Sequence, residues 1–169
     1  ESLLNAIFDS VTARTAGMNS TDTAALAPAS KILTVILMFI GGSPGSTAGG
    51  IKTTTLAVIA ISTFNGITRR QSKGIFGRRL EKDAIHKASS VVFTNMSLAI
   101  FGIIAILAIQ PDLSIPDVIF ECTSAIGTVG MTTGITRDLA TASRLIVAFL
   151  MFCGRVGSVS FALALMEKK

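Results

Sequence analysis

Two tetrapeptides in the sequence could coordinate a metal cation through their backbone. They are Thr15-Ala16-Gly17-Met18 and Thr128-Val129-Gly130-Met131. An extended Thr-x-Gly segment can turn successive carbonyl oxygens toward one point and replace the hydration shell of a dehydrated cation, and glycine supplies the backbone freedom that this requires. Either tetrapeptide alone is better explained as an external turn between two helices, because three-residue matches are common.

The residues before the two tetrapeptides are also alike. Residues 7–13 (IFDSVTA) align with residues 119–125 (IFECTSA), and a one-residue offset then aligns the tetrapeptides. Each upstream segment is apolar and too short to cross a bilayer, so a helix there would end inside the membrane with its negative dipole end toward the cation. The duplication favours two re-entrant pore loops over two unrelated turns.

A charge-free stretch between Lys31 and Lys52 holds the third feature, the segment Gly41, Gly42, Ser43, Pro44, Gly45, Ser46, Thr47, Ala48, Gly49 and Gly50. We call it the Gly-rich segment. No continuous helix tolerates this composition, which predicts two half-helices, about 28–40 and 51–64, joined by irregular backbone. Such backbone survives in a membrane only where it is buried in protein or lines a water-filled cavity. A simple Pro/Gly kink is the plainer alternative.

Two motifs of soluble enzymes fit this segment only formally. Residues 41–45 read G-x-S-x-G, but a nucleophile elbow needs a preceding strand and a His partner, and the only His, His86, lies in a polar loop. Residues 45–52 approach a phosphate-binding loop, but Ile51 separates Gly50 from Lys52. We therefore do not expect an enzyme.

The composition indicates a bilayer as solvent. Half of the 169 residues are apolar and 15% are charged, well below the quarter that is typical of soluble domains. Residues 88–110 carry no charge and predict a membrane-spanning helix, and a second span runs from about 143 to 166, with Arg155 as its one buried charge. Cys122 and Cys153 are expected to be reduced, buried small hydrophobes. The fold class expected is an all-α integral membrane protein.

Charged residues give the orientation. Seven of the fifteen Lys and Arg residues lie between residues 65 and 89, so the loop 65–88 and the C-terminus are expected to be cytoplasmic. This loop either touches anionic lipid or docks a cytosolic regulator, and nucleic-acid binding is not needed to explain it. Asp9 and Glu121 occupy matching places on the outer side, where a cation-attracting vestibule and helix capping remain alternatives, also for Asp22, Asp112, Asp117 and Asp138.

Four motifs resemble one family. TARTAGMNS at 12–20, GGSPGSTAGGIKTTT at 41–55, SAIGTVGMTTG at 124–134 and GRVG at 154–157 closely resemble the Trk/Ktr/HKT superfamily of potassium transporters, above all the membrane subunit of the bacterial Ktr system. The resemblance implies four helix, pore-loop, helix repeats around a pseudo-fourfold pore. This chain would supply the later part of the third repeat (1–64), the basic cytoplasmic loop (65–88) and the fourth repeat (89–169), and would not conduct alone.

The resemblance also implies roles for individual residues. Gly17 and Gly130 would be filter glycines, where sodium-selective relatives can have Ser, and their neighbours would offer carbonyls. The Gly-rich segment would be a gate, held by Arg155, which the residues alone assign equally to the pore or to the cytoplasmic headgroups. Potassium would be the transported ion, with sodium coupling left open.

The implied partners are a second copy of the chain and a cytosolic ring of nucleotide-binding regulatory subunits, in the cell membrane, with no covalent cofactor. Two rival functions remain. A secondary transporter with a broken-helix substrate site would explain the Gly-rich segment alone. A non-conducting membrane scaffold for a cytosolic regulator would leave both tetrapeptides unexplained.

Overall fold

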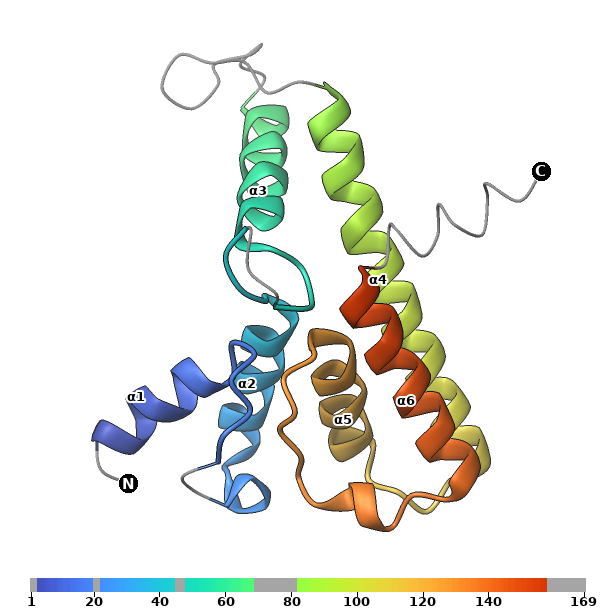
Figure 1. Ribbon diagram of the computed structural model, residues 1–169. Coiled ribbons are helices and arrows are strands. Elements are labelled where there is room, and N and C mark those ends of the chain that lie inside the picture. Colours follow the sequence, from blue (N-terminus) through green and yellow to red (C-terminus); the bar gives the residue numbers. More distant parts are fainter. Residues whose placement is uncertain (1–2, 20–21, 45–47, 69–81, 158–169) are drawn as a thin grey trace, which may run out of the picture.

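The computed structural model describes residues 3–19, 22–44, 48–68 and 82–157, and these residues are mainly helical (Figure 1). In chain order the elements are α1 (Leu3–Thr12), η1 (Thr23–Ala25), α2 (Pro28–Phe39), α3 (Thr53–Ile67), α4 (Lys82–Ile109), α5 (Ile115–Gly127), η3 (Ile135–Arg137) and α6 (Thr141–Val156). Within these ranges the only β pairing is an isolated bridge between Ile40 and Ile51. The expected all-α class agrees with these elements.

One helix in the described ranges is long and apolar enough to cross a membrane by length and composition, and it is Asp83–Ile109 of α4. It contains the span predicted at 88–110. Several of its large apolar side chains are exposed within the chain, among them Phe93, Phe101 and Ile104, whereas Ile106 is buried. At about 1.5 Å per residue this helix is longer than the hydrocarbon core of a bilayer, which is about 30 Å thick.

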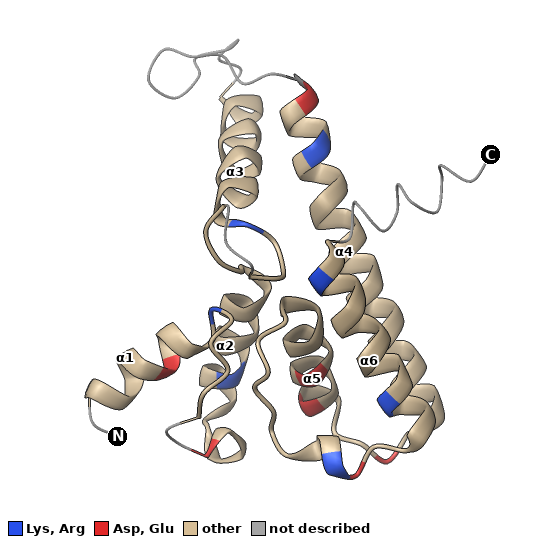
Figure 2. Ribbon diagram, viewed as in Figure 1, with Lys and Arg blue, Asp and Glu red and all other residues tan. Residues whose placement is uncertain are grey.

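The second predicted span is only partly described. α6 covers Thr141–Val156, and the remainder of the predicted span lies outside the described residues. The two helices expected around the Gly-rich segment are α2 and α3, which lie end to end with that segment between them (Figure 1). Figure 2 shows few charged residues along any of these helices.

The core surrounds α5, which packs against α2, α4 and α6. Every residue of α5 from Phe120 to its end is buried. Most of its apolar side chains cluster with residues of α4 and α6, including Ile106 and Leu150, whereas Phe120 packs in a second cluster with Met38 of α2. Cys122 and Cys153 are free and buried, as expected. Because helices cover α5 on several sides, its C-terminal end is held at a fixed place in the middle of the structure.

The start of α6 is fastened to the end of α4 by one side chain. Gln110 Oε1 accepts hydrogen bonds from the backbone N–H of Ala140 at 2.7 Å and from Ser143 Oγ at 2.9 Å, and its Nε2 donates to the carbonyl of Asp138 at 3.1 Å. One amide therefore satisfies a free N–H at the helix start and fixes the angle between two helices that flank α5.

α1 differs from α5 in its surroundings. It contacts α2, but its apolar residues Leu3, Ile7 and Val11 are 79%, 57% and 63% exposed. In the described structure α1 extends to one side of the other helices (Figure 1). The two short helices of the repeat are thus alike in sequence and different in burial.

Candidate functional site

The backbone follows the same unusual path in both tetrapeptides. Thr15 and Thr128 have φ values of 68° and 51°, and they are the only non-glycine residues with positive φ in the part of the chain that the structure describes. Gly17 and Gly130 also have positive φ, at 72° and 89°. A β-branched residue in the left-handed region costs about 1–2 kcal/mol, so its presence at both matching positions indicates a shared structural requirement.

The preceding helix holds each tetrapeptide by matching hydrogen bonds. Thr12 Oγ1 donates to the carbonyl of Met18 at 2.6 Å, and Ser124 Oγ donates to the carbonyl of Met131 at the same distance. The aligned sequences place Thr12 opposite Ser124 and the two Met residues opposite each other. A hydroxyl in the last turn of each short helix therefore fixes the end of each tetrapeptide.

Backbone hydrogen bonds repeat the pattern. The N–H of Ala16 donates to the carbonyl of Thr12 at 3.2 Å, and the N–H of its counterpart Val129 donates to the carbonyl of Ser124 at 2.9 Å. In each copy the second residue of the tetrapeptide thus donates to the aligned helix carbonyl, four residues back in the first copy and five in the second. The two tetrapeptides are thus alike in backbone conformation and in hydrogen bonding as well as in residue type.

The two tetrapeptides also meet in space. A Cβ atom added to Gly17 would lie 2.1 Å from the carbonyl oxygen of Val129 and 3.5 Å from the Cα of Gly130. Only a residue without a side chain permits this approach of two backbones. Backbone carbonyl groups of the two tetrapeptides are therefore neighbours, although more than a hundred residues separate them in sequence.

The Gly-rich segment lies against one of the tetrapeptides. The N–H of Gly49 donates to Thr128 Oγ1 at 3.0 Å, and a Cβ at Gly49 would lie 2.4 Å from that oxygen. The two ends of the segment are held together, because the N–H of Gly41 donates to the carbonyl of Ile51 at 2.8 Å. Residues Gly45, Ser46 and Thr47 lie outside the described residues.

Two basic residues line a cavity of about 340 Å³ beside this segment. Its lining combines Ala48, Gly49, Gly50 and Lys52 with residues 154–157, so Arg155 shares a cavity with the Gly-rich segment. Lys52 Nζ donates to the carbonyl of Ala48 at 2.5 Å. The expected burial of Arg155 is wrong for this chain, since the side chain is exposed at the end of α6, where the cavity opens to the surface.

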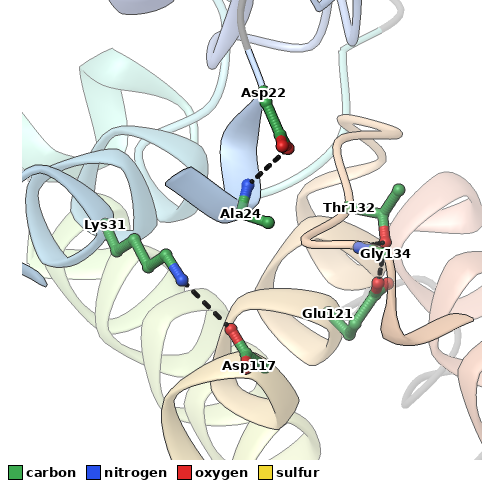
Figure 3. A network of polar contacts seen from close by, with 7 residues as sticks. All are labelled: Asp22, Ala24, Lys31, Asp117, Glu121, Thr132 and Gly134. Carbon is green, nitrogen blue, oxygen red and sulfur yellow. Dashed lines mark hydrogen bonds and ion pairs between the residues drawn. The ribbon is translucent and has the colours of Figure 1, made fainter. Parts of the chain in front are cut away.

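Glu121 is the residue whose place the sequence analysis missed. The sequence left a cation-attracting vestibule and helix capping open as its roles, whereas its side chain is only 5% exposed and serves neither. Its Oε1 accepts hydrogen bonds from Thr132 Oγ1 and, at 2.7 Å, from Thr136 Oγ1. Thr132 Oγ1 in turn accepts from the N–H of Gly134 at 2.9 Å (Figure 3). Glu121 therefore fastens the residues after the second tetrapeptide to α5.

Two of the other acidic residues that were expected on the outer side, Asp22 and Asp117, have ordinary structural partners. Asp22 Oδ1 accepts from the N–H of Ala24 at 3.0 Å and caps η1. Asp117 accepts a hydrogen bond from Lys31 Nζ at 3.4 Å, which joins α5 to α2 (Figure 3). Capping and pairing thus explain Asp22 and Asp117 better than a vestibule does. Within the described ranges no group of three His, Cys, Asp or Glu residues could hold a metal ion.

An all-helical chain with a membrane-length apolar helix and two facing carbonyl-rich loops has the features of a helical membrane protein that handles cations. The model of the TrkH family, described as cation transport protein, matches residues 1–168, and the chain belongs to this family. The family resemblance stated from the four motifs is thereby confirmed. Because the family consists of cation transport proteins, the expectation that the chain is not an enzyme is confirmed as well.

Curated relatives carry consistent names. The chain is 41% identical to the potassium/sodium uptake protein NtpJ of Enterococcus hirae, over 99% of this chain and 38% of that protein. It is 40% identical to Ktr system potassium uptake protein B of Bacillus subtilis, over 91% of this chain and 34% of that protein. It is 35% identical to Ktr system potassium uptake protein D of the same organism, over 94% of this chain and 35% of that protein. The chain thus spans little more than a third of the length of these relatives.

Proposed function

We propose that this chain forms part of the pore of a potassium uptake protein in the cell membrane, and that the two tetrapeptides supply half of its selectivity filter. The observation that carries the proposal is their geometry, in which a left-handed Thr and a glycine recur at matching positions of two backbones in contact. The names of the relatives, which are potassium uptake proteins, support potassium as the transported ion.

Carbonyl oxygens are the ligands that such a filter requires. The tetrapeptides offer backbone carbonyls at the C-terminal, negative ends of α1 and α5, and both features favour a dehydrated cation. Two filter strands make half of a fourfold ring, so the chain would form the third and fourth of four repeats. The exposed apolar side of α1 supports a further repeat beside it.

In this proposal α2 and α3 are the halves of one broken membrane span. Their end-to-end arrangement supports this proposal, as does the backbone hydrogen bond between Gly41 and Ile51 at the two ends of the Gly-rich segment (Figure 1). Irregular backbone at membrane depth must be enclosed by protein or line a water-filled cavity, and the cavity beside Gly49 meets that condition.

The Gly-rich segment is then the gate. It contacts the filter through Gly49 and Thr128, and it lies on the cavity that Arg155 and Lys52 line. Two cationic side chains beside a cation path raise the energy of an ion there. Ions would therefore pass only after the segment and these charges move away from the axis.

The basic loop 65–88 and the C-terminus would face the cytoplasm, where a nucleotide-binding regulatory ring could dock on a homodimer. Residues 69–81 and 158–169, which include most of those charges, lie outside the described residues. The name of the Enterococcus hirae relative includes sodium, which supports sodium as a second ion.

The test is rubidium uptake by the full-length protein in cells that lack their own potassium uptake systems. We expect saturable rubidium uptake and growth at low potassium, both lost when Gly17 and Gly130 are replaced by Ser together. Intact uptake by that double variant at normal membrane levels would favour a secondary transporter instead. A wild-type protein that reaches the membrane and moves no rubidium would favour a scaffold.

A further inference from the structure

We propose that Glu121 is a positioning residue for ion selectivity, which holds the outer end of the second filter strand through the hydroxyls of Thr132 and Thr136. The proposal rests on the filter function assigned to residues 128–131. In this proposal the Glu121 side chain does not contact the ion. It acts on the filter strand through residues 132–136, which follow that strand.

The burial of Glu121 requires an explanation. An ionised carboxylate that is 5% exposed between helices loses most of its hydration, and this loss is large unless hydrogen bonds replace the water. Oε1 receives two hydroxyl donors, one of them at 2.7 Å. Hydrogen bonds to an ionised acceptor are about twice as strong as neutral ones. The hydrogen bonds to Glu121 therefore hold the loop more strongly than the bond from Ser124 Oγ to the neutral carbonyl of Met131.

The position of Glu121 on α5 makes the anchor part of a row. Glu121 and Ser124 are three residues apart and therefore lie on one face of the helix. Ser124 holds the carbonyl of Met131 at 2.6 Å, and Glu121 holds Thr132, the next residue. Because these contacts follow one another along the chain, the filter strand and its continuation are fixed to one helix face.

The second hydroxyl extends the anchor beyond the strand. Thr136 lies in η3, and its Oγ1 is 2.8 Å from Thr132 Oγ1. The N–H of Gly134 donates to Thr132 Oγ1 at 2.9 Å. Because Thr132 Oγ1 itself donates to Glu121, the turn from Thr132 to Gly134 is also linked to that carboxylate. Gly134 has a φ of 101°, which the turn needs to return toward α5. The whole outer loop is organised around one buried oxygen (Figure 3).

A filter discriminates between potassium and sodium only while its carbonyl oxygens keep their places, whether by cavity size or by ligand number. If Glu121 no longer held Thr132, the strand would be held only by Ser124 at the carbonyl of Met131, and the carbonyl of Gly130 would gain freedom and could move toward a smaller ion. The inference is therefore a loss of selectivity rather than a loss of assembly.

Two variants and two matched controls test this in the full-length protein. Thr132→Val removes one donor and keeps the shape of the side chain, whereas Thr132→Ser keeps the hydroxyl. Glu121→Gln keeps the size of the side chain and removes its charge, whereas Asp117→Asn makes the same change on the same helix at a carboxylate paired with Lys31. Rubidium and sodium uptake are measured together, with the amount of protein in the membrane.

We expect Thr132→Val and Glu121→Gln to lower the ratio of rubidium to sodium uptake roughly fivefold or more, since charge-assisted bonds are lost or weakened. Thr132→Ser and Asp117→Asn should stay within about twofold of the wild type. The double variant of Glu121 and Thr132 should lose less than the product of the single effects, because both act through one contact.

Unchanged ratios in both test variants at wild-type membrane levels would overturn the inference, as would an equal loss in Asp117→Asn. If Thr132→Val fails to reach the membrane, the isosteric Glu121→Gln carries the same test. Gly130→Ser is measured alongside as the reference for the filter itself. A normal ratio in Gly130→Ser would refute the filter assignment, whereas an altered one with normal Glu121 variants would refute only the role of Glu121.

Discussion

The two glycines of the proposed filter should respond differently to the same substitution. Gly17 and Gly130 have similar positive φ values, but their surroundings differ. A Cβ at Gly17 would lie 2.1 Å from the carbonyl oxygen of Val129, whereas a Cβ at Gly130 would meet nothing within 4 Å. Gly17→Ala must therefore displace the facing backbone, and Gly130→Ala need not.

The magnitudes follow from these contacts. In Gly130→Ala the cost is the left-handed backbone alone, about 1–2 kcal/mol, which corresponds to roughly five- to thirtyfold in an equilibrium. Gly17→Ala carries the same backbone cost and a steric clash as well. Its Cβ would lie about 1.3 Å closer to the carbonyl oxygen of Val129 than ordinary van der Waals contact allows. A shift of that size displaces a carbonyl of the proposed filter, and discrimination between ions depends on the positions of these carbonyls. We expect Gly17→Ala to abolish selective uptake and Gly130→Ala to reduce it.

The assay is rubidium uptake with sodium competition by the full-length protein, normalised to the amount of protein in the membrane. Gly66→Ala is the control, because Gly66 lies in α3 with no neighbour within 4 Å of the new Cβ. Alanine is favoured over glycine in a helix by about 1 kcal/mol, so this variant should behave as the wild type. Equal effects of Gly17→Ala and Gly130→Ala would refute the proposed contact between the two filter strands.

Three further predictions concern the gate and the helix packing. Gly49→Ala would place a Cβ 2.4 Å from Thr128 Oγ1, so it should unseat the Gly-rich segment and raise unregulated rubidium flux severalfold; an unchanged flux would contradict a seated gate. Arg155→Gln removes a cation from the cavity beside that segment and should also raise basal flux, by roughly severalfold, measured in vesicles without regulatory subunits; a lower flux would argue against an electrostatic barrier. Gly154→Ala would place a Cβ 2.1 Å from the carbonyl oxygen of Ile126, so it should lower the free energy of unfolding by about 1–3 kcal/mol, seen as a lower Tm in detergent; an unchanged Tm would show that α5 and α6 are less closely packed there.

Features fixed by local composition could be predicted from the sequence. The span in α4 follows from an uninterrupted apolar run, and the interruption between α2 and α3 follows from glycine and proline. The duplicated tetrapeptides were visible because residue types repeat in register. The left-handed conformation of Thr15 and Thr128 was not predictable, since β-branched residues normally avoid it and only the surrounding bonds impose it.

Features fixed by contacts distant in sequence were missed. Glu121 reads as a charge near water until the chain after Met131 is seen to fold back on α5. The hydrogen bond between Gly49 and Thr128 joins residues 79 positions apart, and no local pattern announces it. Arg155 was expected to be buried because it interrupts an apolar run, yet it lies where α6 ends beside an open cavity.

The most direct test of the central claim is the ratio of rubidium to sodium uptake by the full-length protein before and after Gly130→Ser. The open space around Gly130 lets the serine fit without a clash, and its left-handed backbone costs about 1–2 kcal/mol, so the ratio is compared at equal amounts of protein in the membrane. The account predicts a clear loss of preference for rubidium while the protein stays in the membrane. An unchanged ratio would mean that residues 128–131 form an ordinary external turn, and the assignment of a filter to this chain would be wrong.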